Sequence, residues 1–284
     1  MGDDSSPAPH APFRPRTYWE DRLGAEYSLA GVGHTGLGRC YNGWMYRLRR
    51  RVFARLLRDL EVDAAGARVL DVGSGTGFYV QLWQAAGVAR IEGIDVTATA
   101  VERLRGRFPE ATFHRGDIGA TEEIEGLDGR FDIVSAMDVL FHIVDDEAFE
   151  RAIARIQRCL REGGWLIFSD NFLHGPERRL PHIVHRRLEH VRGVLEDVGF
   201  QVIERRPMFV VMTAPVACGS PLARRASRAI PWLAGRGEWA GWLLGAILYP
   251  LELALTSWKR ESPTTEVMVC RKRGRANDMA SVRP

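Results

Sequence analysis

Between residues 67 and 198, short apolar runs alternate with stretches of helical periodicity, and this alternation constrains the fold most. A short apolar run between turn signals predicts a buried strand, and strands separated by helices predict a parallel sheet. The expected strands are residues 67–73, 90–96, 111–117, 131–140 and 164–172. The expected helices are residues 77–87, 98–107, 146–160 and 181–198. The sequence therefore predicts an α/β fold.

Two more strand candidates follow, residues 201–212 and 264–273. The roughly 50 residues between them are far more than an ordinary connection needs. They are rich in Pro, Arg and Trp. We therefore expect a helical insertion at about residues 214–262, before the last strand.

The two ends of the chain differ from this central part. Residues 1–16 contain four prolines and little to bury, which predicts a disordered tail, and residues 274–284 predict a frayed one. Residues 17–60 predict a mostly helical segment with a glycine-rich break at residues 31–38. The main domain then covers residues 61–273.

The second half of residues 17–60 has the pattern of an amphipathic helix. Apolar residues recur at every fourth position, namely Trp44, Leu48, Val52, Leu56 and Leu60. Arginines occupy the remaining faces, namely Arg47, Arg49, Arg50, Arg51, Arg55 and Arg58. The pattern predicts one buried face and a basic face exposed to solvent.

Net charge and cysteine spacing bear on the possible partners, metal sites and location of the protein. The net charge of +3 does not require a nucleic-acid partner, and the four cysteines are too scattered for a zinc site. Scattered cysteines and an acidic, Pro-rich N-terminus without an apolar stretch favour a cytoplasmic location over secretion. Residues 239–251 carry no charge but are too short to span a bilayer, so we expect a buried or substrate-facing helix there.

The segment from Val69 to Gly77 reads Val-Leu-Asp-Val-Gly-Ser-Gly-Thr-Gly. It predicts a strand that runs into a glycine turn at Gly73, Gly75 and Gly77, followed by a helix. Such a turn lets the backbone approach a ligand closely and presents free N–H groups at the helix start. The acid that precedes it, Asp71, disfavours a pyrophosphate and suits a ligand with an ammonium group.

Two further acids follow the next two expected strands. Asp95 ends the second strand and can accept both hydroxyls of a ribose. Asp117 follows the third strand, where it can hold an exocyclic amine while Ile118 flanks a purine ring. Acids at the carboxyl ends of successive parallel strands should converge on one crevice.

Five segments, taken in order, resemble the motifs of the class I S-adenosylmethionine-dependent methyltransferases of the small-molecule type. The matching segments are VLDVGSGTG, IEGIDV, HRGDI, FDIVSAMDVLFHI and LREGGWLIFSDNF. The resemblance covers about residues 60–210 and the last strand. It implies a Rossmann-like, seven-stranded, mostly parallel sheet with helices on both faces and an N-terminal helical lid.

The resemblance also implies the cofactor, S-adenosylmethionine, with S-adenosylhomocysteine as its product. Asp71 and the three glycines would surround the methionine part, and Asp95 would bind the ribose. Asp117 and Ile118 would contact adenine, and Met137 would lie along the sulfonium. The implied cofactor-binding residues are Asp71, Gly73, Gly75, Gly77, Asp95, Val96, Asp117, Ile118 and Met137.

Two histidines are candidates for a catalytic base. His142 and His174 both follow the carboxyl ends of expected strands, and histidine is the commonest base for removing a hydroxyl proton. The alternative for His142 is a structural role beside the cofactor. His182, His185 and His190 are expected on one helix, and without a third ligand on their face we predict no metal site.

The two additions to the core are expected to select the substrate. Aromatic residues are frequent in the N-terminal segment (Tyr18, Trp19, Tyr27, Tyr41, Trp44 and Tyr46) and in the insertion (Trp232, Trp239, Trp242, Tyr249 and Trp258). Aromatic walls favour a lipophilic or aromatic small molecule, and we expect methylation at oxygen.

Other readings stay open at this point. The Asn/Asp-Pro-Pro-Tyr/Phe signature of amino-methylating enzymes is absent, so we expect no nucleic-acid substrate. A membrane surface is a minor candidate partner, because a basic face and an apolar insertion occur together. The sequence sets no oligomeric state. The alternative functions are a non-methylating reaction such as a cyclisation, or cofactor binding without catalysis.

Overall fold

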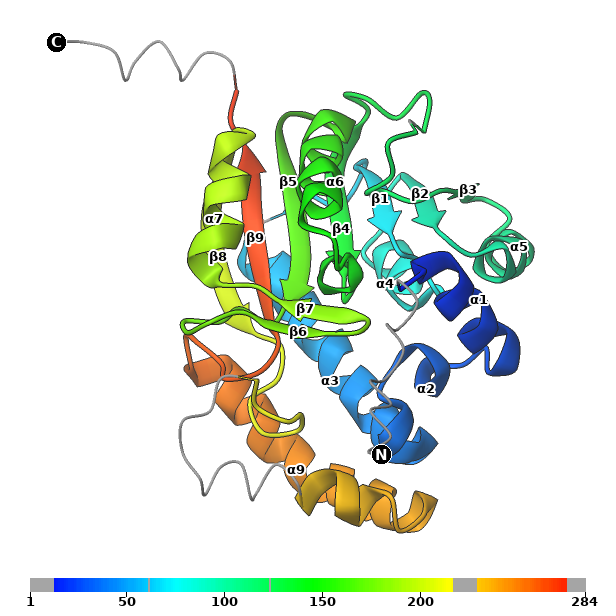
Figure 1. The fold of residues 1–284 in the computed structure, drawn as a ribbon, viewed down its shortest axis with the longest axis vertical. Coiled ribbons are helices and arrows are strands. Elements are labelled where there is room, and N and C mark those ends of the chain that lie inside the picture. Colours follow the sequence, from blue (N-terminus) through cyan, green and yellow to red (C-terminus); the bar gives the residue numbers. More distant parts are fainter. Residues whose placement is uncertain (1–12, 61, 123, 217–228, 275–284) are drawn as a thin grey trace, which may run out of the picture.

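A seven-stranded sheet forms the centre of the molecule in the computed structural model, which describes residues 13–60, 62–122, 124–216 and 229–274 (Figure 1). Its strands are β1 (Arg68–Val72), β2 (Arg90–Asp95), β3 (Thr112–Arg115), β4 (Phe131–Met137), β5 (Leu160–Asp170), β8 (Phe200–Pro207) and β9 (Glu266–Lys272). Their order is β3-β2-β1-β4-β5-β9-β8. Neighbours from β3 to β5 pair in parallel, whereas β9 is antiparallel to both β5 and β8. The predicted mostly parallel sheet is confirmed.

Helices cover both faces of this sheet. Four of them occupy the expected places between or after the strands, namely α4 (Phe78–Ala85), α5 (Ala98–Arg107), α6 (Asp146–Cys159) and α7 (Leu188–Asp197). Alternate strand residues enter two separate cores: Val69 packs with the α3, α4 and α5 side, and Leu70 packs with the α6 and α7 side. The strands are therefore buried on both faces, which explains their continuous apolar sequence.

Three helices form the N-terminal segment, namely α1 (Pro15–Ala25), α2 (Leu29–Val32) and α3 (Gly38–Asp59). The first begins at Pro15, two residues before the expected boundary, and residues 1–12 lie outside the described part. The short 3-10 helix η1 (Thr35–Leu37) lies within the predicted glycine-rich break. The buried face of α3 includes Leu48, Val52 and Leu56, as their spacing predicts.

The insertion between β8 and β9 contains one long helix, α9 (Glu238–Trp258), which packs along α3 (Figure 1). The predicted helical insertion is thus confirmed. Residues 217–228, Cys218 among them, and the tail at 275–284 lie outside the described residues.

The helix expected at residues 181–198 is wrong in its first part. A small antiparallel hairpin of β6 (Arg178–Leu180) and β7 (Ile183–His185) precedes α7, which begins only at Leu188. Pro181 suits the turn of this hairpin, and Ile183 and Val184 are β-branched residues that favour a strand. Of the three histidines expected on one helix, His190 alone lies on α7.

Candidate functional site

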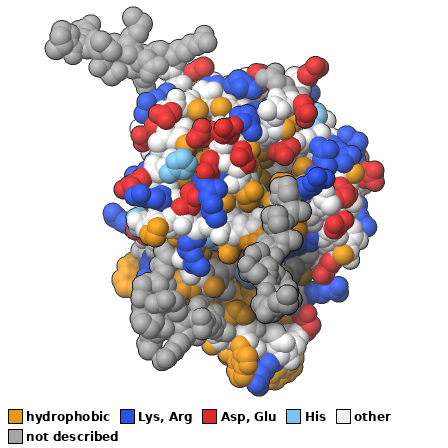
Figure 2. All heavy atoms as spheres, in the orientation of Figure 1, with side chains coloured by type: hydrophobic (Ala, Val, Ile, Leu, Met, Phe, Trp, Pro, Cys, Tyr) orange, Lys and Arg blue, Asp and Glu red, His pale blue; other side chains and the backbone are white. Residues whose placement is uncertain are grey.

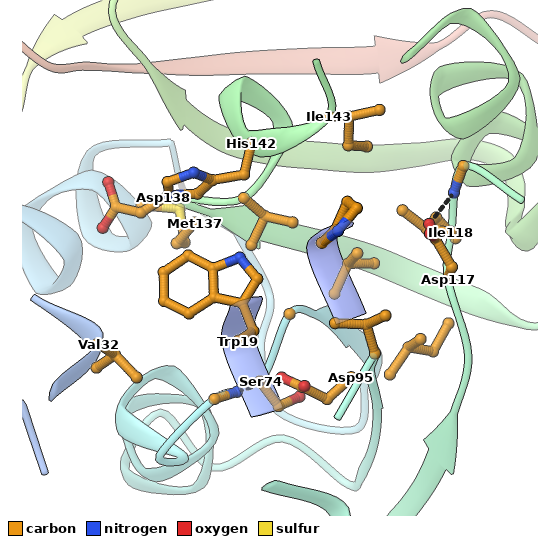
Figure 3. A pocket seen from close by; sticks show the side chains of 18 of the residues that line it. Trp19, Val32, Ser74, Asp95, Asp117, Ile118, Met137, Asp138, His142 and Ile143 are labelled. Carbon is orange, nitrogen blue, oxygen red and sulfur yellow. Dashed lines mark hydrogen bonds between the residues drawn. The ribbon is translucent and has the colours of Figure 1, made fainter. Parts of the chain in front are cut away.

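A pocket of about 450 Å³ lies at the carboxyl ends of β1, β2 and β4, next to α1 (Figure 3). It is lined by eight of the residues singled out in the sequence, namely Gly73, Gly75, Asp95, Val96, Asp117, Ile118, Met137 and His142. Asp71, Gly77 and His174 are not among its lining residues. The topology thus brings the acids of two strand ends and the glycine turn to one crevice, as expected for this kind of sheet.

The glycine turn is held by backbone hydrogen bonds. The N–H of Gly73 donates to the carbonyl of Ile94 at 2.7 Å, and that of Gly77 donates to the carbonyl of Ser74 at 2.8 Å. Gly77 has φ +79°, and a Cβ there would lie 2.5 Å from the ring of Phe108 on the α5 side. A glycine is therefore needed at position 77 for the turn to pack against Phe108, whereas Gly73 and Gly75 form the pocket wall.

Asp71 lies beneath the turn and is almost fully buried. Its carboxylate accepts a hydrogen bond from Ser135 Oγ at 2.7 Å, and Ser135 Oγ accepts one from Trp83 Nε1 at 2.9 Å. Burial raises the pKa of Asp71 to about 7. Ser74 Oγ donates to the Asp71 carbonyl at 3.0 Å, so this residue supports the turn from below.

Asp95 connects the second strand to the same turn. Its Oδ2 accepts from the N–H of Gly75 at 2.8 Å, and its Oδ1 accepts from the N–H and Oγ1 of Thr97 at 2.9 and 2.7 Å. Burial raises the pKa of its carboxyl group. Because a carboxylate oxygen can accept two hydrogen bonds, Oδ2 keeps capacity for a ligand hydroxyl.

Asp117 and Ile118 form the far end of the pocket. Oδ1 of Asp117 accepts from the N–H of Gly119 at 2.9 Å, which fixes the loop after β3 (Figure 3). The apolar side chain of Ile118 is buried beside it. An acceptor next to an apolar surface matches the amine and the face of a purine ring.

The charges along the pocket wall favour a cationic ligand. Its acids are Asp95, Asp117, Asp138 and Asp145, and Arg151 is the single Lys or Arg among its described lining residues. Arg151 lies 3.8 Å from Asp145, and within the described residues neither Asp95 nor Asp117 forms an ion pair. This surplus of carboxylates disfavours a pyrophosphate and suits a sulfonium with an ammonium group. The hydroxyl of Thr76, buried in the same wall, has no partner within the described residues.

The predicted exposure of Arg49 is wrong. Its side chain is about 10% exposed and forms an ion pair with Asp138, which follows Met137 at the end of β4. Asp138 adopts φ +61°, and Ser169 Oγ accepts from its N–H at 2.8 Å. The guanidinium of Arg49 also lies 4.8 Å from the ring centroid of Phe209. Periodicity could not reveal this, because the partner is 89 positions away in the sequence.

His142 is held in one orientation and remains neutral. It ends the short helix η2 (Leu140–His142), and its Nδ1 lies 2.9 Å from the carbonyl oxygen of His182. A carbonyl only accepts, so Nδ1 carries the proton and Nε2 of the neutral ring keeps a free lone pair. Burial lowers the pKa of His142 to about 4. The ring therefore has the protonation state that a base requires.

His174 is placed differently. Its side chain is about 60% exposed, and its Nε2 lies 3.6 Å from a carboxylate oxygen of Glu261. It is outside the pocket, so the two candidate bases are not brought together. Within the described residues, His, Cys, Asp and Glu side chains form no cluster that could hold a metal ion.

The helix α1 lies against the pocket and supplies part of its wall. Glu20 accepts hydrogen bonds from the N–H groups of Ala98 and Thr99 at the start of α5, at 2.7 and 2.9 Å. Tyr27 Oη donates to the carbonyl of Gly75 at 3.0 Å. The ring of Trp19 packs edge-to-face on His142 at 4.9 Å (Figure 3). From α1, the side chains of Pro15, Trp19 and Leu23 line the pocket, and Phe13, just before the helix, lines it as well.

The aromatic residues of the insertion do not line this pocket, although the sequence predicts that they help select the substrate. None of Trp232, Trp239, Trp242, Tyr249 and Trp258 is among the lining residues of this pocket. The aromatic wall consists instead of Phe13, Trp19, Tyr46, Phe78 and Tyr79. Sequence reasoning missed Phe78 and Tyr79, which belong to α4 directly after the glycine turn. It also missed Phe13, because the sequence predicts a disordered tail at residues 1–16.

Comparison with known proteins agrees with this geometry. Residues 69–164 match the family described as methyltransferase domain. This third of the chain is thus similar to a methyltransferase domain. The match contains the glycine turn, Asp95, Asp117, Met137 and His142, and the strand order around it confirms the resemblance seen in the sequence.

Individual relatives match over part of their length. A ubiquinone biosynthesis O-methyltransferase of Thiobacillus denitrificans is 31% identical over 113 residues, or 39% of this chain and 47% of that protein. The chain thus spans about half the length of the curated relatives it matches.

Solved structures share the fold over most of the chain. A 1,6-didemethyltoxoflavin-N1-methyltransferase of Burkholderia thailandensis has a TM-score of 0.53 at 18% identity and covers 93% of both chains. The (4+2)-cyclase SpnF has a TM-score of 0.52 at 22% identity, covering 79% of this chain and 81% of its own. One fold therefore supports methyl transfer in one neighbour and cyclisation in another.

Proposed function

We propose that the pocket binds S-adenosylmethionine. The spare acceptor capacity of Asp95 Oδ2 suits a ribose hydroxyl, and Asp117 with Ile118 suits adenine. The glycine turn leaves room for the methionine part, with the Thr76 hydroxyl as an additional polar contact. The single observation that carries this proposal is one acidic, continuous pocket that joins all of these residues to His142.

We further propose that the protein methylates a lipophilic or aromatic small molecule at oxygen. The bound cofactor supplies an activated methyl group on a sulfonium. The aromatic wall from Phe13, Trp19 and Tyr46 would orient the acceptor and exclude water. His142 Nε2 would take the proton of the acceptor hydroxyl as its oxygen bonds to the methyl carbon and the carbon–sulfur bond breaks. A ubiquinone biosynthesis O-methyltransferase among the relatives supports oxygen as the methylated atom.

His142 fits this role better than His174. Its Nδ1 is engaged by the His182 carbonyl, which leaves Nε2 as the free nitrogen. His174 is exposed beside Glu261 and does not line the pocket. A cytoplasmic location and the absence of a nucleic-acid substrate remain predictions.

The test is a label-tracing experiment with methyl-labelled S-adenosylmethionine and an extract of the source cells. We expect label in the organic-soluble fraction, and no label with the Asp95→Asn variant. Label in protein or nucleic acid would contradict the proposed substrate class. Calorimetry with S-adenosylhomocysteine tests cofactor binding separately.

A non-methylating reaction is the alternative function. The similarity in fold to the cyclase SpnF is the observation that favours it. Its signature would be tight binding of S-adenosylhomocysteine together with conversion of an acceptor to an isomer of unchanged mass. Mass analysis of the products distinguishes the two, because methyl transfer adds one carbon and two hydrogens.

A further inference from the structure

The long helix α9 carries apolar residues on its outer side as well as on the side that faces the core. Its buried residues are Gly241, Gly245, Glu252 and Thr256, which are small or polar. Its exposed apolar side chains are Trp239, Trp242, Leu243, Ile247, Leu251 and Trp258, with exposed fractions from 41% to 86%. A surface helix of a soluble protein usually confines its apolar residues to the side that faces the core, where Leu244, Leu248 and Leu253 of α9 also pack.

Specific contacts fix α9 in this orientation. The buried carboxylate of Glu252 accepts hydrogen bonds from the backbone N–H groups of Val210 and Val211 at 2.5 and 2.9 Å. A Cβ at Gly241 would already lie 3.4 Å from Tyr41, and one at Gly245 would overlap the ring of Trp44. Rotating the helix would expose the carboxylate and force bulkier residues against α3, so the outward apolar face is a specified feature.

The exposed residues form one continuous stripe, which we call the α9 stripe. Their positions, 239, 242, 243, 247, 251 and 258, fall within about half of the helix circumference at 3.6 residues per turn, so they lie on one side of the helix. From Trp239 to Trp258 the stripe is about 28 Å long at 1.5 Å per residue. Figure 2 shows hydrophobic side chains gathered at the lower end of the molecule, where Figure 1 places α9. Isolated exposed apolar residues are ordinary, but a contiguous patch marks an interaction surface.

Cations border the α9 stripe. Arg236 precedes the helix, and Lys259 and Arg260 follow it, all three exposed. The guanidinium of Arg47, on the neighbouring α3, lies 4.3 Å from the ring centroid of Trp44, which is 6.1 Å from that of Trp242. Both acids of α9 accept hydrogen bonds from backbone N–H groups. Glu252 is buried, and Glu238 accepts from the N–H groups of Arg39 and Cys40 at the start of α3.

We infer that the α9 stripe docks the protein flat onto an anionic phospholipid surface. A helix with a wide apolar face, tryptophans near both ends and flanking cations has the features of an interfacial helix. By length and composition α9 could also cross a membrane. However, one full side of it is held against α3 and residues 210–212, so the outer stripe alone can enter the lipid.

The charges disfavour a second copy of the chain as the occupant. An antiparallel pairing of two stripes would place Arg236 opposite Lys259 and Arg260, and a parallel pairing would place like ends together. Both pairings bring cations close, whereas anionic headgroups neutralise them. The inference rests on the outer surface of α9 and is independent of the proposed function.

The experiment is co-sedimentation of the full chain with vesicles of phosphatidylcholine, or of phosphatidylcholine mixed equally with phosphatidylglycerol. We expect binding to the anionic vesicles and weaker binding to the neutral ones. Changing Trp239, Trp242 and Trp258 together to serine should lower the partition coefficient by about tenfold per tryptophan. The matched control is Ile203→Ser, on the edge strand β8, which removes another half-exposed apolar residue and should not affect binding.

A second variant tests the electrostatic part. Changing Lys259 and Arg260 together to glutamine should weaken binding to the anionic vesicles by about fivefold per charge and leave the neutral ones unaffected. All of these side chains are exposed, and an unchanged midpoint of thermal unfolding would confirm that the variants fold. The inference is overturned if the wild-type chain binds neither vesicle, if the triple variant binds equally well, or if light scattering shows a dimer that the triple variant abolishes.

Discussion

The two additions to the core, the N-terminal helices and the insertion, look alike in the sequence but differ in the structure. Both are rich in aromatic residues. Trp19 of α1 lies in the pocket against His142, whereas Trp239 of α9 is 77% exposed on the outer surface. Aromatic content therefore indicates contact with something apolar, and the fold decides whether that is a ligand or an external surface.

Two carboxylates, Glu20 and Glu252, show how the fold makes this choice. Glu20 of α1 binds the start of α5, which places the apolar side of α1 over the pocket. Glu252 of α9 binds the backbone at residues 210–212, which leaves the tryptophans of α9 on its outer side. In each case a few charge-assisted hydrogen bonds set the rotation of a helix and hence the role of its aromatic face.

The largest expected effect separates the two candidate bases. His142→Gln should lower kcat for methyl transfer by about 10²- to 10⁴-fold, because a positioned base contributes that much. His174→Gln, which changes an exposed side chain outside the pocket, should leave kcat unchanged. Steady-state kinetics on the acceptor found by label tracing provide the measurement. Equal losses in both variants would show that the pocket does not define the catalytic centre.

The next effect concerns the cofactor half of the pocket. Asp95→Asn should weaken binding of S-adenosylhomocysteine by about 30-fold, because a charged acceptor of a ribose hydroxyl is lost. Asp63→Asn, at an exposed carboxylate remote from the pocket, is the control. Calorimetry reports both dissociation constants. Unchanged affinity in the Asp95 variant would refute the ribose assignment.

A pair of tryptophan variants tests the comparison directly. Trp19→Ala should weaken S-adenosylhomocysteine binding by about tenfold, since it opens the apolar wall beside His142. Trp239→Ala should leave that dissociation constant as it is and reduce vesicle binding instead. If both variants change the same measurement, α1 and α9 do not have the separate roles that we assign to them.

The most gradual effect, spread over more than two pH units, is on the pH dependence of stability. The pKa of His142 is about 4 in the folded protein, against an ordinary value of 6.5. The unfolded chain therefore takes up a proton first as the pH falls, and stability decreases from pH 6.5 toward pH 4. Relative to His142→Gln, the wild-type chain should lose about 1 kcal/mol per pH unit in this range. Urea unfolding of both proteins at several pH values measures it, and parallel curves would mean that His142 is not buried as a neutral ring.

The parts of the site that the sequence predicted are those with local causes. The glycine turn, Asp95 and Asp117 each follow a strand whose apolar pattern is readable, and parallel strands bring their carboxyl ends together. The helix expected at residues 181–198 wrongly includes β7, because apolar residues in a short segment fit either period. The buried pair of Arg49 and Asp138 had no local signal, since its members come from distant segments.

By itself the sequence determined the order of strands and helices, the place of the glycine turn and the acids that face one crevice. These follow from hydrophobic periods and turn residues, which act over a few positions. The tertiary structure alone decided that Arg49 is buried, that His142 has its free nitrogen at Nε2, and that α9 turns its tryptophans outward. Each of these depends on a partner far away in the chain, and burial and hydrogen bonding are settled only when that partner is in place.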